Sequence, residues 1–294
     1  MTKDIPQIKF NPENTENFGF EIVPIEKIRQ FKKQQNKHDS ELPHQLKFYN
    51  FIYFTEGTGR HFIDFNWYSI TENTLVYLSK EQINAFDFST NLKGYCIVFT
   101  EEYFVKCFSN FSKDFVFRLF NPQLFSPILQ IPTDSDFYTY FNLLEKEYSN
   151  SKMLNQKTII ESLFIILISK AEQIKQHQTH KIKDSTKVVV FQKFTSLIEK
   201  ELTKSRSADY YAKELAITYK HLNSICREFV NKTAKNVIDD FVILQAKRNL
   251  INSNIKSNEL AYKLGFEDPT NFTKYFKKHT GLTPNMFSRS ILNK

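Results

Sequence analysis

Residues 257–284, SNELAYKLGFEDPTNFTKYFKKHTGLTP, contain start and stop signals for two short helices joined by a tight turn. Leu260 and Leu264 lie on one face of the first helix, and Gly265 fits the position just after its end, where a left-handed conformation suits glycine. Asp268-Pro269 starts the second helix, with an acidic N-cap followed by proline at the first helical position. This pattern predicts a helix-turn-helix unit.

The second of these helices has two different faces. One face carries Phe272, Tyr275 and Phe276, which we expect to pack inward. The other face exposes hydroxyl, amide and ammonium groups: Thr270, Asn271, Thr273, Lys274, Lys277 and Lys278. Such groups hydrogen-bond base edges and phosphates in a major groove of DNA.

A similar pattern occurs earlier in the chain. Ser207 can cap a helix that breaks at Ile217-Thr218, and a second helix follows from Tyr219 to about Val230. Its outward face carries Lys220, Asn223, Ser224 and Arg227. An amphipathic helix over 236–251 joins the two units, so the recognition helices are expected in successive major grooves, roughly 10 bp apart. A helical bundle with a basic surface is the structural alternative.

The distribution of charge agrees with a DNA-binding C-terminal region. Residues 1–185 carry 21 Lys/Arg and 22 Asp/Glu, a net charge of −1, whereas residues 186–294 carry 19 and 10, a net charge of +9. The basic excess therefore lies in the last third of the chain, as expected for a nucleic-acid-binding domain joined to a neutral domain.

The N-terminal half has the character of a β domain followed by helices. Its short runs of aromatic and β-branched residues predict strands at Phe20–Ile25, Phe48–Thr55, Gly59–Asn66, Thr74–Leu78 and Tyr95–Thr100. The 30 Phe and 14 Tyr indicate a large aromatic core. Residues 135–149 and 154–175 have helical periodicity and predict an antiparallel pair, which either covers the core or forms a dimer interface.

A polar stretch over 172–187 predicts a linker, and we interpret His177 and His180 as solvated rather than metal-binding. The three cysteines, Cys96, Cys107 and Cys226, form no disulfide framework and favour a reducing compartment. The N-terminus has no apolar signal region and no run is long enough to span a bilayer, so we expect a cytoplasmic protein without a membrane partner or cofactor.

The C-terminal motifs resemble those of AraC/XylS-type transcription regulators over about residues 190–290. The resemblance rests on glycine-phenylalanine at 265–266, phenylalanine-lysine-lysine at 276–278 and Gly281-Leu282-Thr283-Pro284. Asn231 departs from the glycine usual after the first recognition helix, but asparagine tolerates the left-handed conformation. Ser224 departs from a frequent arginine, which implies weaker base readout by the first unit or more reading of DNA shape.

The resemblance implies roles for nine residues. Base contacts are expected from Lys220, Asn223, Ser224, Thr270, Asn271 and Lys274. Phosphate contacts are expected from Arg227, Lys277 and Lys278. Double-stranded DNA is the expected partner, with RNA polymerase as a further one, and the protein is expected to form a homodimer.

Residues 20–110 are similar to the cupin-like effector domain of the same family. A cupin enzyme holds its metal with three histidines and a glutamate, whereas the aligned positions here are His44, Leu46, Asn50 and Asn84. These side chains do not suit a divalent ion, so we expect no metal and no enzyme.

An effector site is the remaining function for an aromatic barrel. We expect an apolar or aromatic effector, with or without a carboxylate, held among Phe48, Tyr53, Phe62 and Tyr77. Lys47, Arg60 or His61 would meet its charge. The alternative is that these rings only fill a core.

These inferences define a multidomain α+β chain. Residues 1–171 form a cupin-like β-barrel with a helical pair, 172–187 a linker, and 188–294 an all-α double helix-turn-helix domain. The function predicted is a sequence-specific, effector-responsive DNA-binding regulator. A cupin-type metalloenzyme with an accessory helical domain and a nonspecific architectural DNA binder are the alternatives.

Overall fold

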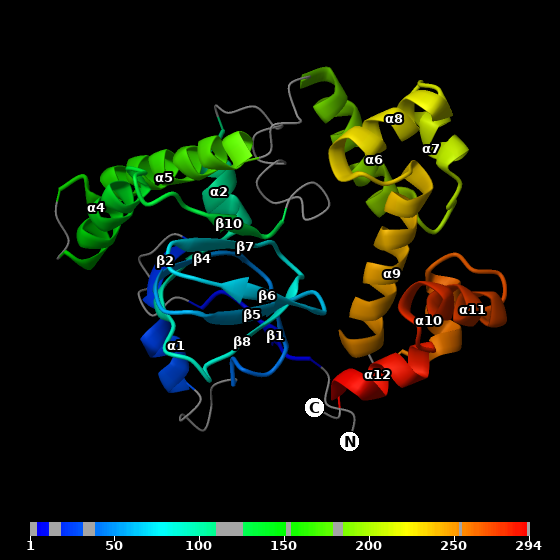
Figure 1. The fold of residues 1–294 in the computed structure, drawn as a ribbon, viewed down its shortest axis with the longest axis horizontal. Helices are drawn as coiled ribbons and strands as arrows, with labels where there is room; N and C mark the ends of the chain where they lie inside the picture. The colour runs from blue at the N-terminus through cyan, green and yellow to red at the C-terminus, as the bar shows by residue number, and fades with distance from the viewer. Residues whose placement is uncertain are drawn as a thin grey trace. The chain divides into compact units, whose positions relative to one another are not determined.

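The computed structural model of the protein describes residues 5–11, 19–31, 39–109, 126–150, 154–178, 185–252 and 255–292. The chain forms two compact units, with the boundary between His180 and Lys181. Strands dominate the first unit, and every element in the described part of the second unit is a helix (Figure 1). The expected fold class is therefore confirmed: a β-rich N-terminal domain precedes a helical C-terminal domain.

The strands of the N-terminal unit form two five-stranded sheets. The first sheet has the order β1 (Gln7–Ile8), β3 (His44–Leu46), β8 (Ile83–Phe86), β5 (Gly59–Ile63) and β6 (Asn66–Ile70). The second has the order β10 (Ile128–Gln130), β7 (Thr74–Leu78), β4 (Tyr49–Glu56), β9 (Lys93–Phe99) and β2 (Phe20–Pro24). The sheets face each other, but within the described ranges no strand pairing joins them into a closed barrel.

The single strand expected over Gly59–Asn66 is wrong, because the chain reverses within it. Asp64 and Phe65 both have positive φ, 43° and 71°. Two consecutive residues in this conformation form a tight hairpin turn. The chain therefore forms two antiparallel strands, β5 and β6, with Ile63 opposite Asn66. The pattern of apolar residues continues through the turn and so concealed it.

Two cores lie on the two faces of the β10–β2 sheet. Along β4, Phe51 and Tyr53 belong to the core under the helices, whereas Ile52 and Phe54 belong to the core between the sheets. A strand that is buried on both faces is apolar at successive positions and shows no alternation in its sequence. The other expected strands near Phe20, Phe48, Thr74 and Tyr95 are present as β2, β4, β7 and β9.

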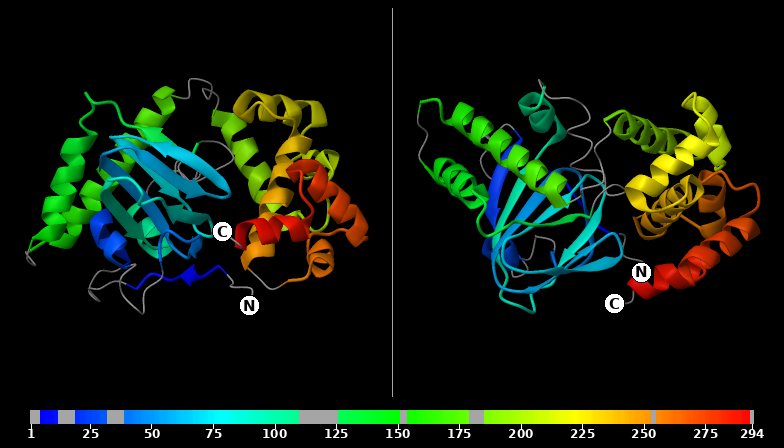
Figure 2. Two further views of the ribbon diagram at one scale, coloured as in Figure 1. Left: turned by 60° about the horizontal axis from the view of Figure 1, so that its bottom comes forward. Right: turned by 45° about the horizontal axis from the view of Figure 1, so that its top comes forward.

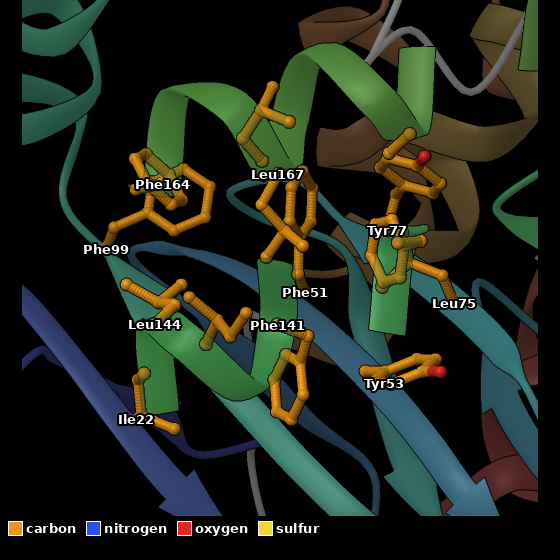
Figure 3. Close-up of a cluster of buried hydrophobic side chains, with 14 of the residues drawn as sticks. Ile22, Phe51, Tyr53, Leu75, Tyr77, Phe99, Phe141, Leu144, Phe164 and Leu167 are labelled. Carbon is orange, nitrogen blue, oxygen red and sulfur yellow. The ribbon is translucent and has the colours of Figure 1, made fainter. Parts of the chain in front are cut away.

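Helices cover the outer face of the β10–β2 sheet. They are α2 (Glu101–Cys107), α4 (Phe137–Ser149) and α5 (Gln156–Gln178), while α1 (Ile25–Phe31) follows β2. Figure 3 shows Phe164 and Leu167 of α5 above Phe99 and Phe51 of the sheet, with ring centroids of Phe99 and Phe164 5.0 Å apart. Figure 2 shows the green α4–α5 pair on one side of the facing sheets in both views. The expected helical pair is confirmed.

The first part of the expected linker continues α5 as far as Gln178. Glu172 and Lys175 are buried there, 7% and 6% exposed, because Ala171 and Ile174 extend the apolar stripe of α5 among polar residues. Residues 179–184, including His180, lie outside the described residues. Helix resumes with α6 at Ser185.

The C-terminal unit contains the expected succession of helices. They are α6 (Ser185–Glu201), α7 (Ala208–Glu214), α8 (Tyr219–Val230), α9 (Ala234–Asn252), α10 (Ser257–Lys263), α11 (Pro269–Thr280) and α12 (Pro284–Leu292). The connector expected over 236–251 is α9, which begins two residues earlier and ends one later. Buried Val237, Val242 and Ala246 anchor α9 in the unit.

Candidate DNA interface and effector cavity

The first candidate recognition helix, α8, has well-defined ends. The Thr218 hydroxyl oxygen accepts the backbone N–H of His221 at 3.1 Å, and Asn231 adopts the left-handed conformation with φ 55°. Leu222, Ile225 and Cys226 are buried. The exposed positions of α8 between its ends include Lys220, His221, Ser224 and Arg227. These positions recur every three or four residues, so they form one polar face.

The second candidate, α11, has the same construction. The Asp268 carboxylate accepts the backbone N–H of Thr270 at 2.7 Å, Pro269 is the first helical residue, and Gly281 is left-handed with φ 77°. Phe272 and Phe276 are buried. The exposed residues are Thr270, Asn271, Lys274, Lys277, Lys278 and His279.

The two faces correspond position by position. A constant offset of 50 residues relates Tyr219 to Pro269 at the first helical position and Asn231 to Gly281 at the left-handed cap. The same offset pairs four exposed positions: Lys220 with Thr270, His221 with Asn271, Ser224 with Lys274, and Arg227 with Lys277. The two helices therefore expose polar side chains at four equivalent positions.

His221 was missed by the sequence reasoning, although the constant offset from Asn271 is a signal that could have found it. Asn223, expected to contact bases, is half-buried, and its side-chain oxygen accepts the backbone N–H of Ala234 at 2.8 Å. This bond satisfies a donor in the first turn of α9, so Asn223 helps to join α8 to α9. The other eight predicted DNA-contact residues are exposed.

A buried carboxylate connects α9 to the second recognition helix. Asp239 of α9 is 7% exposed, accepts a hydrogen bond from the Tyr275 hydroxyl at 2.6 Å and forms an ion pair with Lys235. Burial, reinforced by the hydrogen bond to Asp239, raises the pKa of Tyr275 well above its usual value. The phenol therefore stays protonated and remains a donor, which fixes α11 against α9.

The seven residues expected to hold an effector lie in different surroundings. Phe48 packs between the sheets, whereas Tyr53 and Tyr77 pack under the helices, where the Tyr53 hydroxyl donates to Asn73 at 2.9 Å. Phe62 packs on Trp67, with ring centroids 5.2 Å apart. The two cations are engaged in ion pairs, Lys47 with Glu81 at 3.0 Å and Arg60 with Asp87 at 2.6 Å.

His61 is fully buried, and its ring contacts Phe86 with centroids 4.7 Å apart. Burial, with a smaller contribution from His44, lowers the pKa of His61 to about 3. The imidazole is therefore neutral near neutral pH and does not offer a positive charge to an effector.

A cavity of about 380 Å³ opens between the two sheets. Its apolar walls include Leu46, Phe48, Phe86 and Val98, and its polar groups include Ser40, His44, Asn50 and Asn84. The charged residues of its lining, Lys9, Glu21 and Lys27, are half-buried or exposed. Of the seven residues expected to hold an effector, only Phe48 belongs to this lining.

The structure does bring together the four positions aligned with cupin metal ligands. His44, Leu46, Asn50 and Asn84 all line the cavity. Among the residues that the structure describes, no group of three or more His, Cys, Asp and Glu side chains is arranged to hold a metal ion. Within the same residues, no helix has both the length and the hydropathy needed to cross a membrane.

Comparisons with known proteins match both units. Residues 211–290 match the family model of a helix-turn-helix domain, and residues 32–135 match that of an AraC-like ligand binding domain. The chain is 30% identical over 123 residues to an uncharacterized HTH-type transcriptional regulator in the cgkA 5′ region of Pseudoalteromonas carrageenovora, spanning 42% of this chain and 67% of that protein.

A second relative is the Msm operon regulatory protein of Streptococcus mutans, 24% identical over 149 residues. That match covers 50% of this chain and about half, 53%, of the relative. Among solved structures, unsaturated fatty acid bound ToxT from Vibrio cholerae is similar, with 14% identity, a TM-score of 0.47, and coverage of 95% of this chain and 97% of that one.

Proposed function

Because the chain belongs to the AraC/XylS family, whose members are DNA-binding transcription regulators and not enzymes, we propose that it reads a specific DNA sequence and responds to a small effector. Base readout is assigned to the exposed faces of α8 and α11, and effector binding to the N-terminal domain. The family membership sets aside the alternative of a cupin-type metalloenzyme.

One observation carries the DNA-binding proposal: the exposed faces of α8 and α11 repeat each other at a constant offset of 50 residues. A helical bundle with a merely basic surface needs no such correspondence. Two equivalent polar faces on one connecting helix suit two successive major grooves on one side of a duplex.

The side chains on these faces divide by chemistry. Lys220, His221 and Ser224 of α8, with Thr270, Asn271 and Lys274 of α11, lie in the N-terminal halves of the helices, the part that a recognition helix presents to base edges. Arg227, Lys277 and Lys278 follow in the C-terminal halves and are assigned to phosphates.

Two lysines of α11 test this division. Lys274→Ala should reduce the ratio of specific to nonspecific affinity, whereas Lys278→Ala should weaken binding to all sequences and lower the slope of log K against log [salt] by about one. Fluorescence anisotropy on a selected site and on a scrambled duplex, over a range of salt, measures both quantities. Identical behaviour of the two variants would contradict the division, and equal affinity for both duplexes would favour a nonspecific architectural binder.

The effector proposal is supported by the cavity between the sheets. Its volume of about 380 Å³ lies in the range of small-molecule sites, and its walls are largely apolar with a few polar groups. An apolar or aromatic effector fits such walls. The test is the affinity for the selected DNA site in the presence of metabolite fractions: an effector should change this affinity, and no change with any fraction would contradict the proposal.

A homodimer formed through α4 and α5 is also proposed. Ile159 and Ile166 lie two turns apart on α5 and are 41% and 38% exposed, and Leu143 of α4 is 47% exposed. Ile166→Glu should shift the sedimentation coefficient from dimer to monomer, and a wild-type protein that sediments as a monomer would contradict this interface. Contact with RNA polymerase and a cytoplasmic location remain predictions.

A further inference from the structure

Three buried polar atoms beside the cavity have no hydrogen-bond partner. They are the hydroxyl oxygen of Ser40 and the side-chain carbonyl oxygens of Asn50 and Asn84. These residues are only 7%, 5% and 1% exposed, and all three line the cavity. Buried polar groups in folded proteins almost always have a partner, so these atoms point to a molecule that occupies the cavity.

The orientation of the Asn84 amide is fixed by its nitrogen end. The Asn84 amide nitrogen donates to the backbone carbonyl of His44 at 3.5 Å. The opposite orientation would place two carbonyl oxygens against each other. The side-chain oxygen of Asn50 is buried and has no hydrogen-bond partner. Both amides have a carbonyl oxygen without a partner, and what these oxygens lack is a donor.

The apolar walls around these acceptors indicate the chemistry of the rest of the ligand. Leu46 and Val98 are 4% and 8% exposed and belong to the apolar core between the sheets, together with Phe48 and Phe86. An apolar body is favoured here because it keeps water away from these apolar walls. An apolar group alone would leave the acceptors without a hydrogen-bond donor.

We infer that the effector site takes a compact molecule with an apolar body and a hydroxyl or amino head. A hydroxyl head donates its one hydrogen bond to Asn50 or Asn84, whereas an amino head has enough N–H groups to donate to both. The inference rests on the proposed effector function and specifies its chemistry. It also reassigns the polar contacts, because Lys47 and Arg60 are engaged in ion pairs and the fully buried His61 is neutral near neutral pH. Ser40 is the third contact of the head.

Three probes with the same body test the head group: 2-phenylethanol, 2-phenylethylamine and ethylbenzene. Methyl resonances of Leu46 and Val98 in the full-length protein report occupation of the cavity, and those of Leu144, in the core under the helices, serve as the reference. We expect the alcohol or the amine to bind about tenfold more tightly than the hydrocarbon, the effect of roughly one hydrogen bond to a buried acceptor. The member of the pair that binds more tightly identifies the head.

Variants of the polar residues test which side chains cause the preference for a polar head group. Asn84→Leu and Asn50→Leu keep the branched shape of the side chain but remove the acceptor. The variant that removes the acceptor of the hydroxyl should therefore lower the ratio of alcohol to hydrocarbon affinity about tenfold. Ser40→Ala is a smaller change that perturbs the fold less, and it should lower the ratio of alcohol to hydrocarbon affinity severalfold. Asn66→Leu, at an exposed position of β6, is the matched control and should leave the ratio unchanged.

Two results would overturn the inference: equal affinity for all three probes, or a polar preference that survives in the Asn50, Asn84 and Ser40 variants. Either result leaves the effector proposal standing, because that proposal is decided by DNA affinity. Conversely, a bound alcohol that leaves DNA affinity unchanged contradicts a role as effector but supports the head-group chemistry.

Discussion

Gly265 and Thr203 are in direct contact: a Cβ added to Gly265 would lie 2.4 Å from the backbone carbonyl oxygen of Thr203. Gly265 is in the turn of the second helix-turn-helix unit, and Thr203 is in the segment that enters the first. Arg206 strengthens the contact by donating to the carbonyl oxygen of Gly265 at 3.3 Å and covering the ring of Phe266 at 3.5 Å. The two helix-turn-helix units of the C-terminal region therefore touch each other directly, in addition to being joined by α9.

This contact predicts unequal effects of alanine at two glycines. Gly265 and Gly281 have nearly the same φ, 75° and 77°, but a Cβ on Gly281 would meet nothing within 4 Å. Gly281→Ala should lower the free energy of unfolding by about 1 kcal/mol, the effect of a left-handed backbone alone. Gly265→Ala should lower it by roughly 1–3 kcal/mol more, as an overpacked site. Urea denaturation measures both, and equal losses would contradict a close contact.

The hydrogen bond between Tyr275 and Asp239 predicts a positioning role. Tyr275→Phe keeps the ring but removes the donor at 2.6 Å, so a buried carboxylate loses one partner. The free energy of unfolding should fall by about 1–3 kcal/mol. If this bond also aligns α11, affinity for the selected DNA site should fall while the salt slope stays constant, because no phosphate contact is removed. A changed slope with unchanged specificity would contradict this role.

His221 and Asn223 are adjacent on α8 but should respond differently to alanine. His221→Ala should relax the preference at one base pair of the site bound by α8, by about tenfold, since a good base contact contributes roughly 1–3 kcal/mol. Asn223→Ala removes the bond to the backbone of Ala234 and should lower stability by about 1 kcal/mol. Selection of binding sites from random DNA, together with thermal unfolding, separates the two. A change of base preference in the Asn223 variant alone would reverse the assignment.

Lys175 predicts a pH dependence of stability. Its ammonium lies 4.3 Å from the ring centre of Tyr77, and burial lowers the pKa of Lys175 to about 7, against a smaller opposing effect of Glu172. Between this value and the ordinary 10.5, the unfolded chain binds more protons, so the free energy of unfolding rises with pH, by up to about 1.4 kcal/mol per unit. Below pH 7 the burial penalty is present in full.

Lys175→Met should therefore stabilise the protein near pH 7 and remove most of the rise between pH 7 and 9.5. Urea denaturation of both proteins across this range is the measurement. Lys146→Met, at an exposed position of α4, is the control and should keep the wild-type slope. A Lys175 variant with an unchanged slope would show that the ammonium stays charged in the folded protein.

The helical part of the fold was predictable in detail because its signals are local. Asp268-Pro269, Gly281 and the apolar spacing around Phe272 define α11 without reference to the rest of the chain, and the structure places the helix between those signals. The same holds for α8, where Asn231 occupies the left-handed position expected of it. Asn223 was the exception, since its partner Ala234 follows a turn whose path no spacing reveals.

The cavity was less predictable than the helices. His44, Asn50 and Asn84 were aligned correctly as neighbours from the resemblance to a cupin, and the structure brings them together. The aromatic residues chosen beside them were distributed differently, because β4 is buried on both faces and its sequence does not show which ring faces which layer. Tyr53 and Phe54, adjacent in sequence, belong to different cores.

The sequence by itself determined the two helix-turn-helix units, the basic charge of the C-terminal region and the β-rich character of the N-terminal one. These features follow from helix caps, from periodicity and from composition. Caps and periodicity are set by residues close together in the chain, and composition does not depend on the order of the residues. Only the tertiary structure decided that Gly265 meets Thr203 and that Ser40 joins Asn50 and Asn84 in the lining of one cavity. Contacts between residues far apart in the chain depend on strand register and packing, and a one-residue shift of register would turn Asn50 to the opposite face of its sheet.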